Sequence, residues 1–264
     1  MKVFLIRHAE TIHNVGQAWA GSTDSPLTSH GILQIERLAQ YFASTRTRFS
    51  HVFSSDLHRA VATAEGINTT NTTELRLTAL LQEQQFGSRE GTVFRRSRRN
   101  NEEKEEDAVF VPAETELAMR DRANAFLNDY FLPAVFEADS TSQAIAIVAH
   151  GIILRVLWEC LTRLFSPGAV QFSPTGGGGG ALTPFWSNTG FMEVSIEPDA
   201  ALLDNPTSSI SLLSDFVLSG WSMTVLSIDS KPHLADLRRT RGGIGSMQHD
   251  TSQKRIDSFF RPRS

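Results

Sequence analysis

Three short apolar runs constrain the fold of this chain more than any other feature of its sequence. They are Val3–Ile6, Val52–Phe53 and Ile145–Ala149. Short continuous apolar runs are typical of strands that are buried on both faces of a parallel sheet. Each run is followed closely by polar or charged residues, so the predicted strand ends carry side chains that could bind a ligand or take part in catalysis. Two further runs, Met192–Ile196 and Met223–Ile228, predict additional strands.

Helical patterns lie between these strands. Residues 54–56 are expected to start a helix capped by Ser55, and another helix follows His150. Thr28 is placed to cap a helix with an apolar stripe of Ile32, Ile35, Leu38 and Phe42. Strands that alternate with helices predict an α/β fold, here a three-layer α/β/α arrangement with a mostly parallel central sheet. Ligands bind such sheets at the carboxyl ends of the strands.

The composition limits the class of protein. Of 264 residues, 40% are hydrophobic and 20% are charged, which is typical of globular domains. The formal net charge of -4 excludes a globally basic nucleic-acid binder, and we expect no direct nucleic-acid partner and no membrane partner. The lone Cys160 excludes an intramolecular disulfide, and we expect a reducing, cytoplasmic and/or nuclear location.

Three segments depart from the globular pattern and divide the chain. A charged insertion occupies residues 95–107, and a glycine-rich loop occupies residues 174–183. The chain from residue 238 onward is at first rich in Gly, Ser and Arg without an apolar period. We therefore expect one domain over residues 1–237, which carries the candidate chemical residues, and a flexible tail over residues 238–264.

The predicted strand ends bring together residues that fit the binding and transfer of a phosphoryl group. His8 follows the first strand, and an imidazole with one unprotonated nitrogen is a competent nucleophile. Arg7, and Arg59 in the first turn of a helix, offer planar forks of donors that match phosphate oxygens. His150 ends another strand and, with Gly151, opens a helix whose N–H groups favour an anion.

Two further residues complete this candidate set. Asn14 follows His8 in the same loop and is placed to donate a hydrogen bond to a phosphate oxygen. Glu83 follows a short apolar stretch and is a candidate general acid. An isolated Arg-His pair has little meaning, so the prediction depends on the whole set.

Five motifs occur in a fixed order along the chain. They are Arg7–Asn14 (RHAETIHN), Gly21–Gly31 (GSTDSPLTSHG), Phe53–Ala64 (FSSDLHRAVATA), Leu81–Gly91 (LQEQQFGSREG) and Val148–Gly151 (VAHG). Together they resemble the motifs of the histidine phosphatase superfamily, in the branch that contains the cofactor-dependent phosphoglycerate mutases. The resemblance implies a phosphoglycerate mutase-like fold and covers residues 1 to about 165.

The resemblance also implies a role for each residue at the centre of the site. His8 would attack phosphorus and form a phosphohistidine. Arg7, Arg59 and His150 would hold the phosphoryl oxygens. Glu83 would protonate the leaving oxygen and then activate water. These roles agree with the needs of phosphoryl transfer, which are positioning and charge stabilisation.

Around this centre, the resemblance implies a set of substrate-binding residues, which are Asn14, Thr23 and Gly151. We expect no cofactor and no metal ion, because the two arginines supply the positive field that the phosphoryl group needs. The expected partner of this site is a small phosphorylated substrate.

Departures from the family pattern favour a phosphatase over a mutase. Ala9 stands where the family has glycine, and its small side chain should leave the loop intact. The charged segment 95–107 does not match the basic substrate-binding stretch of the glycolytic mutases. A mutase must also keep its phosphoenzyme from water, which a phosphatase need not do. Two alternatives stay open: a phosphoglycerate mutase-type phosphotransferase, and a non-catalytic clamp-associated interaction protein on a phosphatase scaffold.

The predicted tail carries a second short motif. Gln253, Ile256, Phe259 and Phe260 fit the pattern Q-x-x-[ILM]-x-x-[FY]-[FY]. This pattern resembles the PCNA-interacting motif, which docks on the sliding clamp. The three apolar residues are spaced so that one helical turn places them on one face. We expect the sliding clamp as a partner, with packing of the tail on the domain itself as the alternative.

Overall fold

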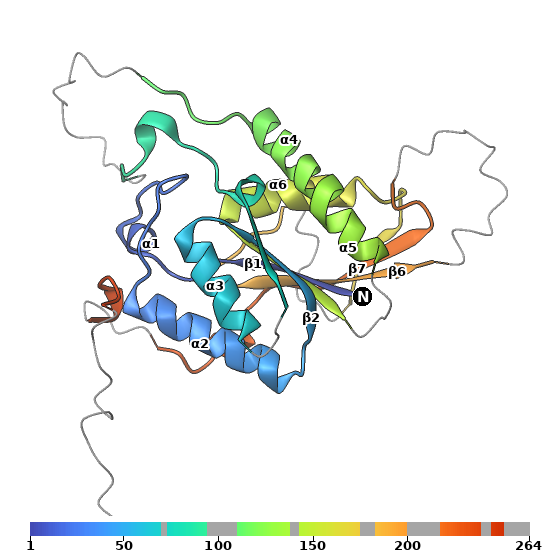
Figure 1. Ribbon diagram of the computed structural model, residues 1–264, viewed down its shortest axis with the longest axis horizontal. Helices are drawn as coiled ribbons and strands as arrows, with labels where there is room; N and C mark the ends of the chain where they lie inside the picture. The colour runs from blue at the N-terminus through green and yellow to red at the C-terminus, as the bar shows by residue number, and fades with distance from the viewer. Residues whose placement is uncertain are drawn as a thin grey trace, which may run out of the picture.

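The computed structural model describes residues 1–69, 73–93, 110–137, 143–174, 183–199, 217–238 and 244–250. In this part of the chain, a seven-stranded sheet has the order β3-β2-β4-β1-β6-β7-β5 (Figure 1). The strands are β1 (Lys2–Arg7), β2 (Phe49–Ser55), β3 (Leu75–Thr78), β4 (Ala144–Ala149), β5 (Val170–Phe172), β6 (Phe191–Pro198) and β7 (Trp221–Ser230). All five apolar runs predicted as strands lie within these elements.

The sheet is mostly parallel, as predicted. β4 pairs in parallel with β1 and β2, β2 with β3, and β5 with β7, whereas β6 runs antiparallel to β1 and β7. Arg7 is the register partner of Ala149 in the β1–β4 pair. The carboxyl ends of these two strands are therefore level, and the residues that follow them leave the sheet side by side.

Helices cover both faces of the sheet, which confirms the three-layer α/β/α architecture (Figure 1). Phe4 and Ile6 of β1 pack in a core with helices α2 and α3, whereas Val3 and Leu5 pack in a core with α4, α5 and α6. Because side chains alternate along a strand, β1 is buried on both faces, as its apolar run predicts. The helices are α1 (Ile12–Gly16), α2 (Ser29–Ser44), α3 (His58–Asn68), α4 (Glu116–Phe126), α5 (Leu132–Phe136) and α6 (Gly151–Thr162), with a π-helical turn at Leu127–Phe131.

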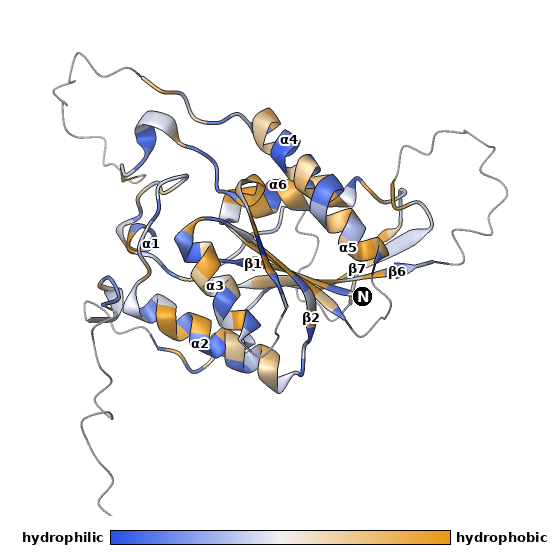
Figure 2. Ribbon diagram, viewed as in Figure 1, coloured by the Kyte–Doolittle hydropathy of each residue, from blue (hydrophilic) through white to orange (hydrophobic). Residues whose placement is uncertain are grey.

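The helices differ in how much of their surface is buried. The side chain of Thr28 accepts a hydrogen bond from the N–H of Gly31 at 2.9 Å, which confirms the predicted cap of α2. Figure 2 shows apolar and polar positions alternating along α2, whereas α6 is apolar along most of its length. The buried residues of α6 lie on more than one face of the helix, so α6 packs more deeply than a single apolar stripe requires; they are Ile153, Leu154, Val156, Leu157, Trp158, Cys160 and Leu161.

The start of α3 differs from the prediction. The helix begins at His58 and its N-cap is Leu57, so the prediction that Ser55 caps it is wrong. Ser55 is still extended, because it pairs with Thr78 in the parallel β2–β3 ladder. Its hydroxyl accepts a hydrogen bond from Leu57 N–H at 3.3 Å and so shapes the turn before the helix. Arg59 nevertheless lies in the first turn of α3, as expected.

Residues 244–250 fall within the predicted tail but pack on the domain. Main-chain hydrogen bonds join Ser29 N–H to Met247 O at 3.1 Å, and His249 N–H to Leu27 O at 2.9 Å. The domain therefore extends beyond the expected boundary at residue 237. Main-chain pairing needs no particular side-chain pattern, so the composition of this segment gave no sign of it.

Several predicted features lie outside the described residues. These are the charged insertion 95–107, the interior of the glycine-rich loop 174–183 and the tail motif 253–260. Among the helices that the structure does describe, none is long and apolar enough to cross a membrane.

Candidate active site

His8 and His150 lie next to each other at the carboxyl ends of β1 and β4. The main-chain N–H of His8 donates to the carbonyl of Ala149 at 3.0 Å, which extends the parallel pairing past the end of β1. The centroids of the two imidazole rings are 5.0 Å apart. His8 is 4% exposed and His150 is completely buried. Parallel strand register thus places two histidines that are distant in sequence beside each other.

One hydrogen bond determines which nitrogen of His8 carries the proton. Nδ1 lies 2.7 Å from the carbonyl oxygen of Ala9, which only accepts, so Nδ1 is protonated and Nε2 holds the lone pair. Burial, with the positive charges of Arg59 and Arg7, holds the pKa of His8 well below its ordinary value of 6.5. The ring is therefore neutral at physiological pH, and Nε2 is available as a nucleophile.

Arg59 is 1% exposed, and hydrogen bonds to protein groups satisfy its buried guanidinium. Nη1 donates to the carbonyl of Thr23 at 2.8 Å, and Nη2 donates to the carbonyls of Ala20 at 3.0 Å and Gly21 at 2.7 Å. Nε donates to Nδ1 of His150 at 3.2 Å. Nδ1 of His150 therefore holds the lone pair, and Nε2 carries the hydrogen.

Two buried donors at this edge of the sheet have no partner among the described residues: Nε of Arg7 and Nε2 of His150. The rest of Arg7 is fixed, because Nη1 donates to the carbonyl of Trp186 at 2.9 Å. A Cβ on Gly151 would lie 3.8 Å from Arg7 Nε, an ordinary van der Waals contact, so Gly151 lies directly beside this part of the guanidinium. Buried donors without partners are costly, and here they mark a place for an anion.

Asn14 is oriented by its neighbours. Its Oδ1 accepts hydrogen bonds from Thr11 N–H at 3.1 Å and from Asn188 Nδ2 at 3.0 Å. With the oxygen engaged in this way, the amide nitrogen is the atom that Asn14 offers to a ligand. Asn188 also donates to the carbonyl of His8 at 3.1 Å, so one side chain links Asn14 to the backbone of the histidine.

Glu83 occupies the N-terminus of α6. Its Oε2 accepts from Ile152 N–H at 3.1 Å, and its Oε1 accepts from Ile153 N–H at 3.0 Å and Gln84 N–H at 3.1 Å. The first amides of a helix have no partner within the helix, so they are natural partners for a carboxylate. These bonds fix the carboxyl group of Glu83 at the edge of the pocket, where it is 9% exposed.

Glu90 organises the loop that supplies the carbonyl partners of Arg59. Its carboxylate accepts hydrogen bonds from the main-chain N–H groups of residues 21–23 and of Phe86, at 2.9 to 3.3 Å. Burial acts to raise the pKa of Glu90, but these hydrogen bonds outweigh it and lower the pKa below 4.5. A Cβ on Gly21 would clash with Glu90, so only glycine allows this close approach.

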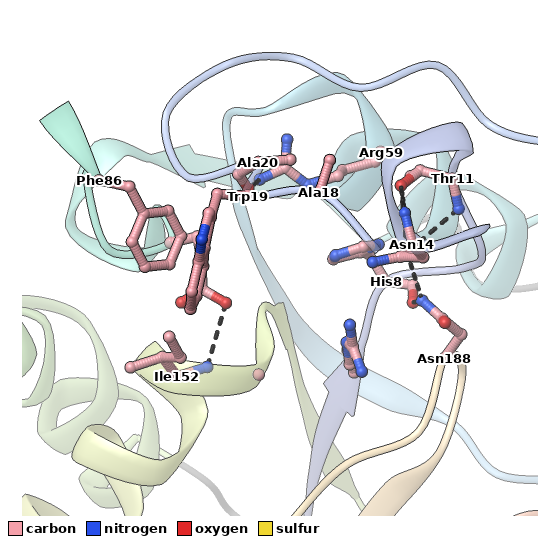
Figure 3. Close-up of a pocket in the computed structure, with 13 residues that line it drawn as sticks. His8, Thr11, Asn14, Ala18, Trp19, Ala20, Arg59, Phe86, Ile152 and Asn188 are labelled. Carbon is pink, nitrogen blue, oxygen red and sulfur yellow. Dashed lines mark hydrogen bonds between the residues drawn. The ribbon is translucent and has the colours of Figure 1, made fainter. Parts of the chain in front are cut away.

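A single pocket of about 400 Å³ gathers most of these groups (Figure 3). Thr23 does not line it, because its main chain holds Arg59 and Glu90 instead. His150 lies just behind the wall and reaches the site through His8 and Arg59. The lining residues are Arg7, His8, Thr11, Asn14, Ala18, Trp19, Ala20, Arg59, Glu83, Phe86, Gly151, Ile152 and Asn188.

Sequence reasoning missed several residues of this pocket. Trp19, Phe86 and Asn188 line it, but none belongs to a spacing pattern that signals chemistry. Glu90 lies inside a quoted motif, and its fixed distance from Glu83 was the signal that could have singled it out. Within the described ranges, no group of three or more His, Cys, Asp or Glu side chains is placed to hold a metal ion.

Comparison with known proteins identifies the family. The sequence pattern of the histidine phosphatase superfamily (branch 1) matches residues 3–174, which is more than half of the chain. The chain belongs to this superfamily. The predictions of the histidine phosphatase family and of a phosphatase-type enzyme are therefore confirmed.

Two relatives in sequence place the chain within the superfamily. A Schizosaccharomyces pombe protein named "Probable phosphatase C1620.13" is 31% identical over 258 residues, which cover 97% of this chain and 78% of the yeast protein. "Probable phosphoglycerate mutase GpmB" of Proteus mirabilis is 42% identical over only 65 residues, which cover 25% of this chain and 29% of the bacterial protein. The similarity to a phosphatase-named protein thus extends along the chain, whereas the similarity to the mutase-named protein is local.

Solved structures confirm the fold of this histidine phosphatase superfamily member. "Mycobacterial hydrolase 1" aligns with a TM-score of 0.60 at 19% identity and covers 87% of this chain and 99% of its own. The phosphoserine phosphatase of Entamoeba histolytica, solved with 3-phosphoglyceric acid, aligns with a TM-score of 0.55 at 22% identity over 88% and 98% of the two chains. The predicted phosphoglycerate mutase-like architecture is confirmed.

Proposed function

We propose that this enzyme hydrolyses a phosphomonoester through a covalent phosphohistidine on His8. The observation that carries the proposal is the pair of buried donors without partners, Arg7 Nε and His150 Nε2, beside a neutral imidazole. A tetrahedral dianion beside His8 would meet Nε of Arg7 and the amide of Asn14 in the field of Arg59, while His150 acts from behind the pocket wall through its contacts with His8 and Arg59. The site thus offers a nucleophile and a preformed cradle for phosphoryl oxygens.

In the first step, Nε2 of His8 attacks phosphorus. An N–P bond forms, the P–O bond to the alcohol breaks, and Glu83 gives a proton to the leaving oxygen. In-line displacement needs the acid and the nucleophile on opposite sides of phosphorus. Ile152, whose N–H holds Glu83, lies across the pocket from His8 in Figure 3.

In the second step, water replaces the alcohol. Glu83, now a carboxylate, takes a proton from water as the water oxygen attacks phosphorus and the N–P bond breaks. Inorganic phosphate leaves, and His8 is restored with its proton still on Nδ1. Arg7 and Arg59 stabilise the charge of the transferring group in both steps.

A direct test combines turnover with capture of the intermediate. Purified protein should hydrolyse p-nitrophenyl phosphate, and His8→Ala should lower kcat by about three orders of magnitude or more. Acid-labile ³²P should be retained on wild-type protein quenched during turnover, and not on His8→Ala. Vanadate should inhibit as a mimic of five-coordinate phosphorus. Unchanged hydrolysis by His8→Ala would refute the mechanism.

The same preparation distinguishes hydrolysis from mutase activity. A mutase returns the phosphoryl group to the organic intermediate, so 3-phosphoglycerate would become 2-phosphoglycerate with little inorganic phosphate. A phosphatase releases phosphate from its substrate at a rate equal to alcohol formation. A protein inactive on a broad panel of phosphomonoesters would instead support the non-catalytic alternative.

We further propose, from the tail sequence alone, that this phosphatase is tethered to the sliding clamp PCNA. Gln253, Ile256, Phe259 and Phe260 supply the polar and apolar anchors of that motif. Purified clamp should retain the wild-type chain and fail to retain the Phe259→Ala/Phe260→Ala double variant. Equal retention of both proteins would refute the tether and leave the phosphatase proposal unaffected.

A further inference from the structure

One side of the catalytic pocket is an aromatic wall formed by Trp19 and Phe86. The centroids of the two rings are 4.4 Å apart with an interplanar angle of 47°. Figure 3 shows these two side chains across the pocket from His8, Asn14 and Asn188. The pocket therefore has a polar side that fits the phosphoryl group and an aromatic side that faces the rest of the substrate.

The aromatic wall is held in place by the backbone. Trp19 N–H donates to the carbonyl of Thr92 at 2.9 Å, and Gly91 N–H donates to the carbonyl of Trp19 at 2.8 Å. Phe86 is 7% exposed, and its N–H donates to Glu90 at 2.9 Å. Both residues are thus fixed before a ligand arrives, which lowers the entropy cost of binding.

The other lining residues on this side are also apolar or have their polar atoms engaged. Ala18, Ala20 and Ile152 present only apolar side chains to the pocket. Glu83 accepts main-chain hydrogen bonds at both carboxyl oxygens, and its remaining capacity serves the leaving oxygen in the proposed mechanism. Among the described lining residues, this side therefore lacks the array of fixed polar partners that the hydroxyl groups of a sugar require.

We propose that the alcohol part of the substrate carries a planar apolar ring that packs on Trp19 and Phe86. The proposal rests on the phosphatase function above and names its substrate class: phosphomonoesters of ring-bearing, apolar alcohols rather than of polyols. A flat ring would bury apolar area against the exposed part of this aromatic pair at little conformational cost, whereas a polyol would lose hydrogen bonds to water without replacement.

Two primary alkyl esters with alcohols of similar leaving ability test this class. We expect kcat/KM for 2-phenylethyl phosphate to exceed that for glucose 6-phosphate by about tenfold or more, the size of one stacking contact. Trp19→Ala should reduce this ratio about tenfold, and the milder Phe86→Leu should reduce it in the same direction. Phe172→Ala removes an aromatic side chain that is 51% exposed on β5, outside the pocket, and should leave the ratio unchanged.

Calorimetry on His8→Ala protein separates this inference from the proposed function, since binding does not need turnover. Tighter binding of 2-phenylethyl phosphate than of glucose 6-phosphate, without turnover by the wild type, would keep the substrate class and overturn the phosphatase function. Turnover with equal or better use of glucose 6-phosphate would overturn the substrate class alone. An equal loss on both esters in Trp19→Ala, with an unchanged melting temperature, would also overturn it.

Discussion

The guanidinium of Arg59 donates a hydrogen bond from Nε to Nδ1 of His150 over 3.2 Å. This bond fixes the tautomer of the second histidine and leaves Nε2–H as a donor without a partner in the described part of the chain. Burial, then the neighbouring His8 and arginines, hold the pKa of His150 well below 6.5. His150 is therefore a neutral hydrogen-bond donor rather than a cation.

Replacement of Arg59 by lysine tests this arrangement. Lysine keeps the charge but lacks the fork that reaches three carbonyls and His150 at once, so both the loop and the tautomer lose their support. We expect kcat/KM to fall by about a hundredfold or more and the melting temperature to fall with it. Arg163→Lys, at an exposed position after α6, is the matched control. Wild-type kinetics in Arg59→Lys would contradict the role.

The pH profile should report the environment of His8. Its lowered pKa keeps the imidazole neutral, so the loss of kcat/KM that results from its protonation should lie well below pH 6.5. Arg7→Met removes one of the positive charges that lower the pKa of His8. The fall of kcat/KM at low pH, which we call the acid limb of the profile, should therefore move to higher pH by up to roughly one unit. Arg7→Lys keeps the charge and should retain the wild-type limb. The three proteins are compared by their profiles of kcat/KM against pH on one substrate, each normalised to its maximum. Superimposable acid limbs in all three proteins would contradict the claim that the charge of Arg7 lowers the pKa of His8.

The role of Glu83 predicts a dependence on the leaving group. Glu83→Gln should lower kcat/KM for the hydrolysis of alkyl phosphates by about two orders of magnitude or more, because a poor leaving oxygen must be protonated as it departs. The step that releases the leaving group should be slowed least for p-nitrophenyl phosphate, because p-nitrophenolate leaves readily without a proton. A plot of log kcat/KM against the pKa of the alcohol should be steeper for the variant than for the wild type. Parallel lines would remove Glu83 from the acid role.

Glu90 predicts a dependence of stability on pH. Because its folded pKa is lowered, its contribution to stability is present above the unfolded pKa and is lost as pH falls through the folded pKa. Glu90→Gln should lower the free energy of unfolding at about pH 7 by on the order of 1–3 kcal/mol. The deficit relative to the wild type should shrink as the pH falls below 4.5 and through the lowered pKa of Glu90. Glu116→Gln should lower the free energy of unfolding by well under about 1 kcal/mol, because the ion pair of Glu116 with Arg120 in α4 is exposed to solvent.

The central strands and the residues directly after them could be predicted from the sequence. Val3–Ile6 and Ile145–Ala149 are apolar without interruption, and such runs leave few alternatives to buried parallel strands. Once these strands are paired, His8 and His150 must leave the sheet at the same edge. The prediction therefore depended on local patterns and on one rule of topology.

The rest of the site depends on contacts between segments that carry no local signal. Trp19 and Phe86 meet because the loop around Gly21 folds onto Glu90, and no periodicity encodes that approach. Asn188 reaches the site from the loop before β6. The start of α3 was mispredicted because Ser55 is a good cap residue by type but is still engaged in a β ladder.

The reversed direction of β6 determines where the chain tolerates additions. Its first residue, Phe191, pairs with Ile6 near the catalytic edge, while its last, Pro198, pairs with Trp221 at the far edge of the sheet. The last residue of β6 and the first residue of β7 therefore both lie on the side of the molecule that is remote from His8. A fluorophore or affinity tag attached at these strand ends would sit at the opposite end of the sheet from the pocket.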